Sequence, residues 1–365
     1  MNRRRREAEP PGRGCGAEPL PCACYGEPMI PTRLDRWLPP LAWANLAAVL
    51  IVTGLVLFVG DRWWAAAVLT YLPRLPWLGP AAVLLGLAAW RRAWVPAGLS
   101  LAAAAVVAGP LMGLRVGLGR TAGAESLRIA TCNIQDARPR LELVLRELKR
   151  VDPDVVVFQE SSQPRPDFEA EWPEWHTHHE ATFFAASRWP LEPLGLVESD
   201  SMRRWSAAAV RVRHPSRPFV LVNVHLATAR HGLAPLRDRD TPIGTALERL
   251  HVHQALREGE LFDLREFVEP FEDEPVVLAG DFNQPSDAKF LTRAFGEWTN
   301  AFDAAGRGYG YTAPCDSGRL WPHNCPWLRI DHVLTRPGEY GVAHAEIGRT
   351  AGSDHRLVAA DLVWD

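Results

Sequence analysis

Residues 276–283 read V-V-L-A-G-D-F-N, an apolar run that ends in Asp281, Phe282 and Asn283. A short run of aliphatic residues bounded by proline and glycine predicts a buried β-strand. A carboxylate or amide directly after such a strand loses hydration, which costs free energy unless the group has a partner. The end of this strand is therefore a candidate position for chemistry.

The same arrangement recurs along the chain. Strands are expected over Ser126–Asn133, Asp154–Gln159, Phe219–Val224, Pro275–Ala279 and Arg356–Val363. An acid, an amide or an imidazole stands beside each of them, and a further aspartate stands in R-I-D-H-V-L. The candidate residues, in chain order, are Asn133, Glu160, His225, Asp281, Asn283, Asp331, Asp354 and His355.

Several carboxylates that converge at one edge repel one another, and a bound hard cation removes this repulsion. Mg²⁺ prefers oxygen ligands and uses one or two carboxylates, so Glu160 with Asn133 is a suitable partial ligand set. The sequence shows no Cys/His set at the spacing of a zinc site. We therefore expect Mg²⁺, or Mn²⁺ in its place.

Residues 121–365 combine many short strands with a few helices, expected at Arg138–Val151 and Thr245–Phe267. This mixture predicts an α+β domain in which sheet packs on sheet. The face of the second helix that carries Arg249, His251, His253 and Arg257 is expected to be solvated.

Seven motifs in order carry a resemblance: T-C-N-I, F-Q-E, S-R-W-P, V-N-V-H-L, G-D-F-N, R-I-D-H-V and G-S-D-H. From Leu127 to Trp364 the chain resembles the endonuclease/exonuclease/phosphatase (DNase I-like) family, which includes DNase I-type nucleases, sphingomyelinases and inositol-polyphosphate phosphatases. With its apolar N-terminal segments it looks like a membrane-anchored bacterial member. The resemblance implies a four-layer α/β-sandwich with the site at one edge.

The resemblance also implies roles for the candidate residues. Glu160 corresponds to a metal-ligating glutamate, Asn133 to a neighbouring contact of the metal or the phosphate, and Asp354 to a contact of the same or a second metal. Asp281 corresponds to the aspartate that activates water, and Asn283 to an amide that stabilises the phosphoryl oxygens. His225 corresponds to a histidine that contacts the phosphate or protonates the leaving oxygen. His355 corresponds to a phosphate-facing histidine held in orientation by Asp331.

The function expected from these roles is Mg²⁺- or Mn²⁺-dependent hydrolysis of a phosphate ester, most simply a phosphodiester. The substrate is a nucleic acid or a phospholipid or sphingolipid. A formal net charge of −3 and the lack of a basic patch with interleaved aromatic residues weaken the nucleic-acid hypothesis. The substrate-setting loops are expected at Ala227–Thr241 and Ser161–Ala186. The alternative is a catalytically silent membrane receptor or scaffold on the same fold, and no protein partner is predicted.

The N-terminal third differs in composition from the rest of the chain, because a polar leader is followed by long apolar runs. Residues 1–36 are expected to be a disordered leader, with Met29 as an alternative start of translation. Residues 37–114 are expected to form a transmembrane region of about three helices, over Leu38–Gly60, Leu75–Trp90 and Ala93–Leu114, because crossing a bilayer takes roughly 20 apolar residues. Trp63–Leu69 is expected to lie along the membrane surface, and a soluble helical bundle is the alternative.

Arginines predict the orientation of this region. Seven precede the first apolar run and Arg91 and Arg92 separate the last two, whereas the first connection holds Arg62 and Arg74. The positive-inside rule then places the N-terminus in the cytoplasm and the catalytic domain outside the inner membrane. An additional crossing at Trp63–Leu69 would invert this orientation.

Three smaller features leave alternatives open. Cys315 and Cys325 bracket a polar loop and form either a disulfide or two unrelated thiols. The W-H-T-H-H stretch over 175–179 is expected to be a solvated loop rather than a metal site. The R-R-W stretch over 203–205 either contacts an anionic substrate or anchors a loop.

Overall fold

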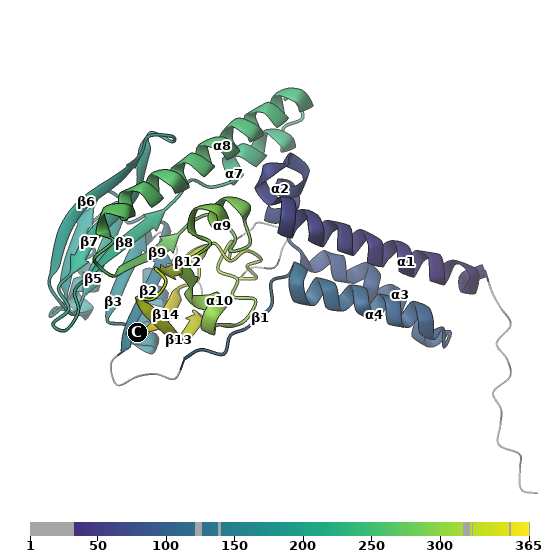
Figure 1. The fold of residues 1–365 in the computed structure, drawn as a ribbon, viewed down its shortest axis with the longest axis horizontal. Helices are drawn as coiled ribbons and strands as arrows, with labels where there is room; N and C mark the ends of the chain where they lie inside the picture. The colour runs from purple at the N-terminus through teal and green to yellow at the C-terminus, as the bar shows by residue number, and fades with distance from the viewer. Residues whose placement is uncertain are drawn as a thin grey trace, which may run out of the picture.

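The computed structural model describes residues 33–120, 126–137, 140–316, 322, 324–349 and 352–364. Most of the expected leader, including Met29, lies outside these residues. The described chain forms a helical region that projects from a layered domain (Figure 1). The layered domain carries all eight candidate residues.

Two six-stranded sheets form the middle of the layered domain. The first sheet has the strand order β13-β14-β2-β3-β5-β4, with bounds Tyr340–Ile347, Val358–Trp364, Ser126–Asn133, Val155–Gln159, Phe183–Ser187 and His176–Glu180. The second has the order β10-β12-β9-β8-β7-β6, with bounds Thr299–Asn300, Asp331–Thr335, Val276–Asp281, Phe219–His225, Arg204–Val212 and Leu191–Ser199. A short pair, β1 (Arg115–Val116) with β11 (Arg307–Gly308), lies apart from both sheets.

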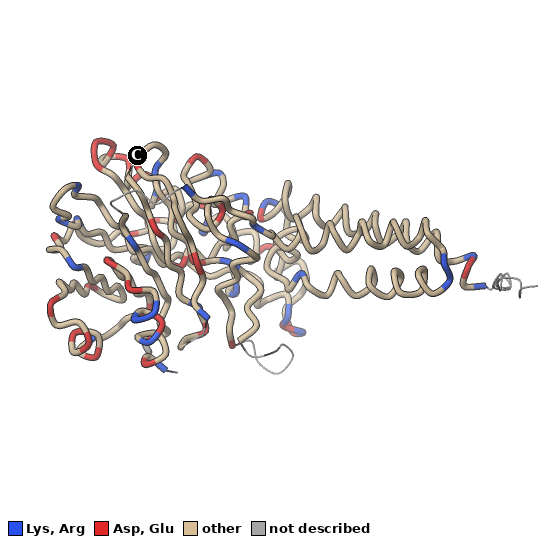
Figure 2. The backbone as a smooth tube through the Cα atoms, turned by 90° about the horizontal axis from the view of Figure 1, so that it is seen from below, with Lys and Arg blue, Asp and Glu red and all other residues tan. Residues whose placement is uncertain are grey.

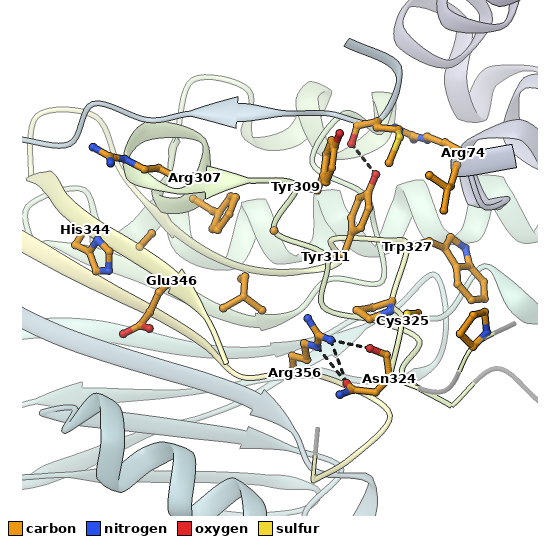
Figure 3. A pocket seen from close by; sticks show the side chains of 18 residues that line it. Arg74, Arg307, Tyr309, Tyr311, Asn324, Cys325, Trp327, His344, Glu346 and Arg356 are labelled. Atoms are coloured by element: carbon orange, nitrogen blue, oxygen red, sulfur yellow. Dashed lines mark hydrogen bonds between the residues drawn. The ribbon is translucent and has the colours of Figure 1, made fainter. Parts of the chain in front are cut away.

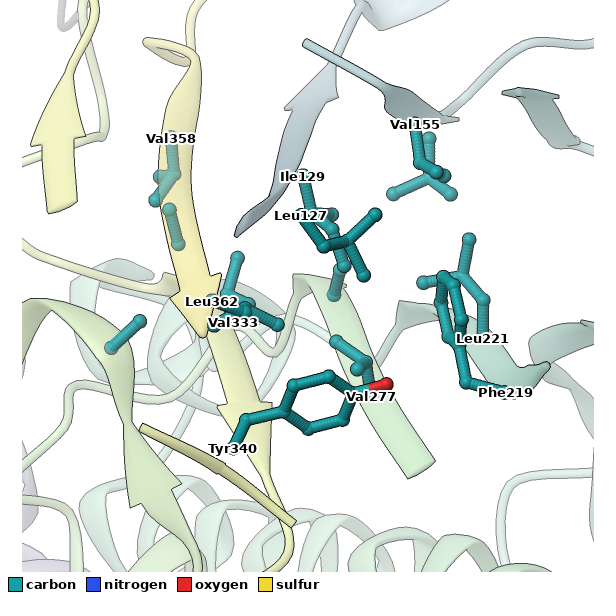
Figure 4. Packing of buried hydrophobic residues seen from close by; sticks show 14 of the residues in the cluster. Leu127, Ile129, Val155, Phe219, Leu221, Val277, Val333, Tyr340, Val358 and Leu362 are labelled. Carbon is teal, nitrogen blue, oxygen red and sulfur yellow. The ribbon is translucent and has the colours of Figure 1, made fainter. Parts of the chain in front are cut away.

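The central strands are apolar on both faces, and alternation decides which layer each side chain joins. On β2, Leu127 and Ile129 enter the core between the sheets, whereas Ala130 and Cys132 face the helices outside. Figure 4 shows the inner core, where side chains of both sheets meet, among them Val155, Phe219, Leu221, Val277, Val333, Val358 and Leu362. Each fully buried aliphatic or aromatic side chain stabilises the fold by about 1.5–3 kcal/mol.

Helices complete the outer layers. On the first sheet lie α5 (Leu141–Val151) and α6 (Pro166–Glu171), and on the second lie α8 (Ile243–Val268) and α9 (Lys289–Phe295). The short helix α7 (Arg230–Leu233) packs against α8, and α10 (Ala301–Ala305) packs against β12 and β13. The four-layer α/β-sandwich expected from the sequence is confirmed.

Each sheet contains one parallel pair of strands, β2 with β3 and β8 with β9. The four C-terminal ends of these strands, together with the beginnings of the antiparallel strands β12 and β14, collect the polar residues at one edge of the sandwich. Gly280 permits the close pairing of β8 and β9, because a Cβ at this position would lie 2.0 Å from the carbonyl oxygen of Val224.

The helical region consists of α1 (Arg33–Gly54), α2 (Trp64–Tyr71), α3 (Leu78–Trp90) and α4 (Trp94–Val106). Two continuous helical stretches, Arg33–Arg62 and Trp94–Leu111, are long and apolar enough to cross a membrane. A third candidate joins Trp64–Tyr71 to Leu75–Trp90 through a 94° bend. Large apolar side chains on the outside of the bundle are exposed, including those of Ile51, Phe58, Val83 and Leu101.

Two loop predictions are wrong. The Ser161–Ala186 stretch contains α6, β4 and most of β5, and the Ala227–Thr241 stretch contains α7. The histidines of W-H-T-H-H lie on β4, which pairs antiparallel with β5 at the edge of the first sheet. Pairing with a neighbouring strand overrides the polar composition of this segment. Cys315 and Cys325 are both thiols in the structure.

Candidate active site

The ends of the two parallel strand pairs bring the candidate residues together. In the strand register His225 and Asp331 both pair with Asp281. A cavity of about 420 Å³ opens above them, and six of the eight candidates line it: Glu160, His225, Asp281, Asn283, Asp354 and His355. The other two, Asn133 and Asp331, are buried beside the cavity and contact its lining residues through hydrogen bonds.

Asp281 lies at the centre of this group. One of its carboxylate oxygens accepts a hydrogen bond from the backbone N–H of Asn283 at 2.8 Å. The other oxygen accepts from Nδ2 of Asn283 at 3.1 Å and from Nδ2 of Asn133 at 3.2 Å. Burial raises the pKa of Asp281, an effect that the positive charge of His355 opposes and the carboxylate of Asp331 reinforces. A carboxyl group with a raised pKa is suited to accept a proton.

Asp331 and His355 form a buried pair. The Nδ1 of His355 lies 2.9 Å from a carboxylate oxygen of Asp331, and its Nε2 lies 3.7 Å from an oxygen of Asp281. Burial lowers the pKa of His355, but the carboxylates of Asp331 and Asp281 outweigh this effect and raise it to about 10. His355 is therefore an imidazolium at neutral pH, with its ring held by Asp331.

His225 has the opposite electrostatic character. Its Nε2 lies 3.6 Å from a carboxylate oxygen of Glu160 and 3.9 Å from one of Asp281. Burial, together with the positive charges of Arg204 and His355, lowers the pKa of His225 to about 3. A neutral imidazole can contact a phosphate, but it does not suit the second role implied by the resemblance, protonation of the leaving oxygen.

Glu160 stands on the open side of the cavity. Its side chain is 40% exposed, and Nδ2 of Asn133 donates a hydrogen bond to it at 3.0 Å. Its backbone has a φ of 49°, in the left-handed region that costs a residue other than glycine about 1 kcal/mol or more. Such strain concentrates at functional sites, because the surrounding structure has to hold it in place.

Glu160 and Asp354 carry oxygen ligands suited to a hard cation. Both residues line the same cavity, and the amide of Asn133 lies beside Glu160. A second group, Asp281, Asp331 and His355, brings its ligand atoms within 4.8 Å of one another. In that group the Nδ1 of His355 already contacts Asp331, so the exposed oxygens around Glu160 fit Mg²⁺ better.

Asn283 contributes differently from the implied role. Its Nδ2 donates to the carbonyl oxygen of Leu226 at 2.8 Å as well as to Asp281. Both amide hydrogens are thereby engaged, so in this structure Asn283 orients Asp281 rather than presenting a donor to the cavity.

Several residues beyond the eight candidates line the cavity. Arg204 of the R-R-W stretch, expected either to contact an anionic substrate or to anchor a loop, lines the cavity and also pairs with buried Glu260 at 3.3 Å. Arg230, His231 and His253 extend the cavity wall along α7 and α8. The expectation of a solvated face on α8 holds for Arg249 and His251, which are exposed. It is wrong for Arg257, which is only 2% exposed because α7 and the ends of β8 and β9 cover it.

A larger cavity of about 720 Å³ lies between the sandwich and the helical region (Figure 3). Tyr309, Tyr311 and Trp327 line it, together with cationic side chains such as Arg307. Glu346 is the single acidic residue among its described lining residues. It has no group of carboxylates to hold a metal and activate water, so the smaller polar cavity is the candidate active site.

A family model described as "Endonuclease/Exonuclease/phosphatase family" matches residues 130–355. No curated protein matches the sequence.

Solved structures with a similar fold include a 3'-5' exonuclease from Neisseria meningitidis, 19% identical, covering 65% of this chain and 100% of its own, with a TM-score of 0.48. TDP2 of D. rerio, humanised by 14 mutations, is 16% identical, covering 65% and 99%, with a TM-score of 0.48. A mannosyl-6-phosphatase from Bacteroides thetaiotaomicron is 15% identical, covering 65% and 100%, with a TM-score of 0.46. Because the family model spans more than half of the 365 residues, the chain belongs to the endonuclease/exonuclease/phosphatase family of metal-dependent phosphate-ester hydrolases.

Proposed function

We propose that this chain is a membrane-anchored phosphodiesterase that uses Mg²⁺ or Mn²⁺. One observation carries the proposal: Glu160, Asp281, Asp354 and His355, far apart in sequence, line a single cavity at the edge of the sandwich. Hydrolysis of a phosphodiester needs an activated water, neutralisation of the phosphoryl charge and an oriented substrate. The chemistry of these side chains matches those needs.

Glu160, with Asp354 and Asn133, would hold the metal, which when bound neutralises the nonbridging phosphoryl oxygens. Asp281 accepts the proton of the attacking water, and the two hydrogen bonds from Asn283 fix the direction of its carboxylate. The imidazolium of His355 adds positive charge next to the phosphate, and Asp331 keeps it protonated. Neutral His225 contacts the substrate without exchanging a proton.

Membrane anchoring is supported by the helical region. Figure 2 shows charged residues gathered at the end of the helices that is remote from the sandwich, with an uncharged shaft between. An ion pair there joins Arg91 to Asp35, so α1 begins where α3 ends. Trp64–Tyr71 and Leu75–Trp90, joined through a 94° bend, count together as one crossing in this proposal. Three crossings, with the arginine-rich end in the cytoplasm, put the sandwich outside the inner membrane.

The neighbourhood of the site favours a phospholipid or sphingolipid over a nucleic acid. The loop that carries Asn283 continues into Gln284, whose side chain accepts a hydrogen bond from Tyr71 in the connection between the apolar helices. An active site this close to the anchor lies near lipid headgroups, where a phosphodiester of a lipid is the nearest substrate.

The test uses the full-length chain in detergent. We expect hydrolysis of a chromogenic phosphodiester with Mg²⁺ or Mn²⁺ and none with a chelator. Sphingomyelin, a phosphoinositide and plasmid DNA are then compared, and the lipid substrates are expected to be turned over fastest. No turnover of any of them with either metal would favour the silent receptor or scaffold.

A further inference from the structure

Arg257 is a buried cation that lies outside the eight candidate residues. It stands on α8, is 2% exposed, and its guanidinium donates three hydrogen bonds. Nε donates to the carbonyl oxygen of Ala227 at 2.8 Å, and Nη2 donates to that of Asn283 at 2.6 Å. Nη1 donates to the hydroxyl of Tyr71 at 3.0 Å. A buried charge is tolerated when hydrogen bonds satisfy it, and these three define what Arg257 holds together.

Two of the three acceptors belong to the active site. Ala227 follows His225 by two residues at the end of β8, and Asn283 follows Asp281 by two residues at the end of β9. The planar guanidinium therefore joins the two backbone segments that leave the parallel strand pair. The second segment includes the N–H group that donates to Asp281, so its position fixes the direction of that carboxylate.

The third acceptor belongs to the connection between the apolar helices. Tyr71 is the last residue of α2, and its ring lies under the guanidinium of Arg257 at 5.4 Å. Its hydroxyl donates to Oε1 of Gln284 at 3.1 Å, and its carbonyl oxygen accepts from Nε1 of Trp327 at 3.1 Å. Tyr71 thus contacts the loop after β9 both directly and through Arg257.

Gly60 and Asp61, in the connection between α1 and α3, contact the helices α8 and α9 of the sandwich. Nε2 of Gln254 on α8 donates to the carbonyl oxygen of Asp61 at 2.8 Å. Gly60 packs closely against Lys289 at the start of α9, where a Cβ on the glycine would lie 2.9 Å from the lysine Cγ. Figure 1 shows α2 between the end of α1 and the helices α8 and α9.

The geometry points to Tyr71 and Arg257 as positioning residues, through which the connection between the membrane helices forms part of the catalytic apparatus. The inference rests on the proposed function of the same site. With the Tyr71 hydroxyl removed, Arg257 keeps its two carbonyl acceptors, but Gln284 loses its donor and the loop from Asp281 to Gln284 loses its outer support. A misplaced Asp281 slows the chemical step, whereas substrate contacts on the opposite wall of the cavity remain.

The experiment compares two tyrosine substitutions in the full-length chain in detergent. Tyr71→Phe removes the hydroxyl beside the active site and keeps the ring. Tyr309→Phe is the matched control, because the Tyr309 hydroxyl also joins the sandwich to the helical region, at Ala108, but lies in the larger cavity (Figure 3). We expect Tyr71→Phe to lower kcat about tenfold with KM changed less than twofold, and Tyr309→Phe to leave both constants unchanged. Arg257→Lys, which cannot form the planar fork, is expected to lower kcat further.

A second measurement does not depend on activity. Hydrogen exchange of the backbone amides from Asp281 to Gln284 is expected to accelerate in Tyr71→Phe and to stay at the wild-type rate in Tyr309→Phe. A wild-type chain without turnover would refute the proposed function, while the exchange rates would still decide whether Tyr71 supports this loop. Equal kcat and equal exchange rates in the two variants, or a lowered melting temperature with wild-type kcat, would overturn the positioning role.

Discussion

The candidate active site has an open half and a buried half. The side chain of Glu160 on the open half is 40% exposed, whereas the side chains of Asp281 and Asp331 on the buried half are 1% and 0% exposed. The open half presents oxygens that water and a cation can reach, and the buried half consists of hydrogen-bonded pairs that need no ion to be satisfied. Under the proposed function, the open half would bind the metal and the buried half would control protons.

The largest effect is expected from Asp281→Asn, which removes the proton acceptor without changing its shape. We expect kcat to fall by about 10³- to 10⁴-fold, the upper range for a general base. Asp152→Asn is the matched control, because Asp152 is an exposed acid paired with Arg188 on the surface. Steady-state kinetics check the prediction, and a loss of less than about tenfold in Asp281→Asn would contradict the assigned role.

Glu160→Gln should lower activity by weakening the binding of the metal. At a metal concentration that saturates the wild type we expect a loss of about 10²- to 10³-fold, because the phosphoryl charge is then poorly neutralised. Raising the concentration of Mg²⁺ or Mn²⁺ should restore part of the activity of this variant and none of the activity of Asp281→Asn. If the activities of Glu160→Gln and Asp281→Asn responded equally to added metal, the distinction between the open half and the buried half would be wrong.

Asp331→Asn should shift the pH dependence of kcat/KM. The carboxylate of Asp331 is the largest of the three charges, with those of Asp281 and Asp354, that raise the pKa of His355 to about 10, so the imidazolium is present below that pH and lost above it. Without this carboxylate, burial favours the neutral ring and the alkaline limb of kcat/KM should move to lower pH. We expect a loss of about 10²-fold at pH 7. Glu160→Gln is the control and should keep the alkaline limb of the wild type.

The smallest effect is expected on stability. Because the buried half is hydrogen-bonded without an ion, chelation should leave the sandwich folded and lower the melting temperature by about 2–4 °C, which corresponds to about 1 kcal/mol in a domain of this size. Glu160→Gln should show no such response to the metal. Unfolding on chelation, followed by thermal melts, would mean that the ion is structural.

The positions of the site residues could be predicted from the sequence because each follows or precedes an apolar strand. Alternation along β2 and β9 assigns the inner and outer faces, and the strand expected over Pro275–Ala279 differs from β9, Val276–Asp281, by only one or two residues at each end. The resemblance supplied the four-layer architecture, which the periodicity of single strands does not contain. These are local signals, readable from one stretch at a time.

The contacts of Arg257 could not be predicted in this way. On α8 its neighbours in sequence are charged and polar, and this pattern is typical of a solvated face. Its burial depends on α7, the ends of β8 and β9, and Tyr71, which lies 186 positions earlier in the chain. The electrostatic contrast between His225 and His355 is equally non-local, because both are buried and only His355 lies beside Asp331.

The central claim is that Glu160 lies in a site that binds a divalent cation and Asp281 acts beside it. Mn²⁺ binding to the full-length chain, followed by electron paramagnetic resonance, tests this claim directly. We expect the wild type and Asp281→Asn to bind Mn²⁺ and Glu160→Gln to bind it much more weakly. Equal binding by wild type and Glu160→Gln, or no binding by the wild type, would contradict the account.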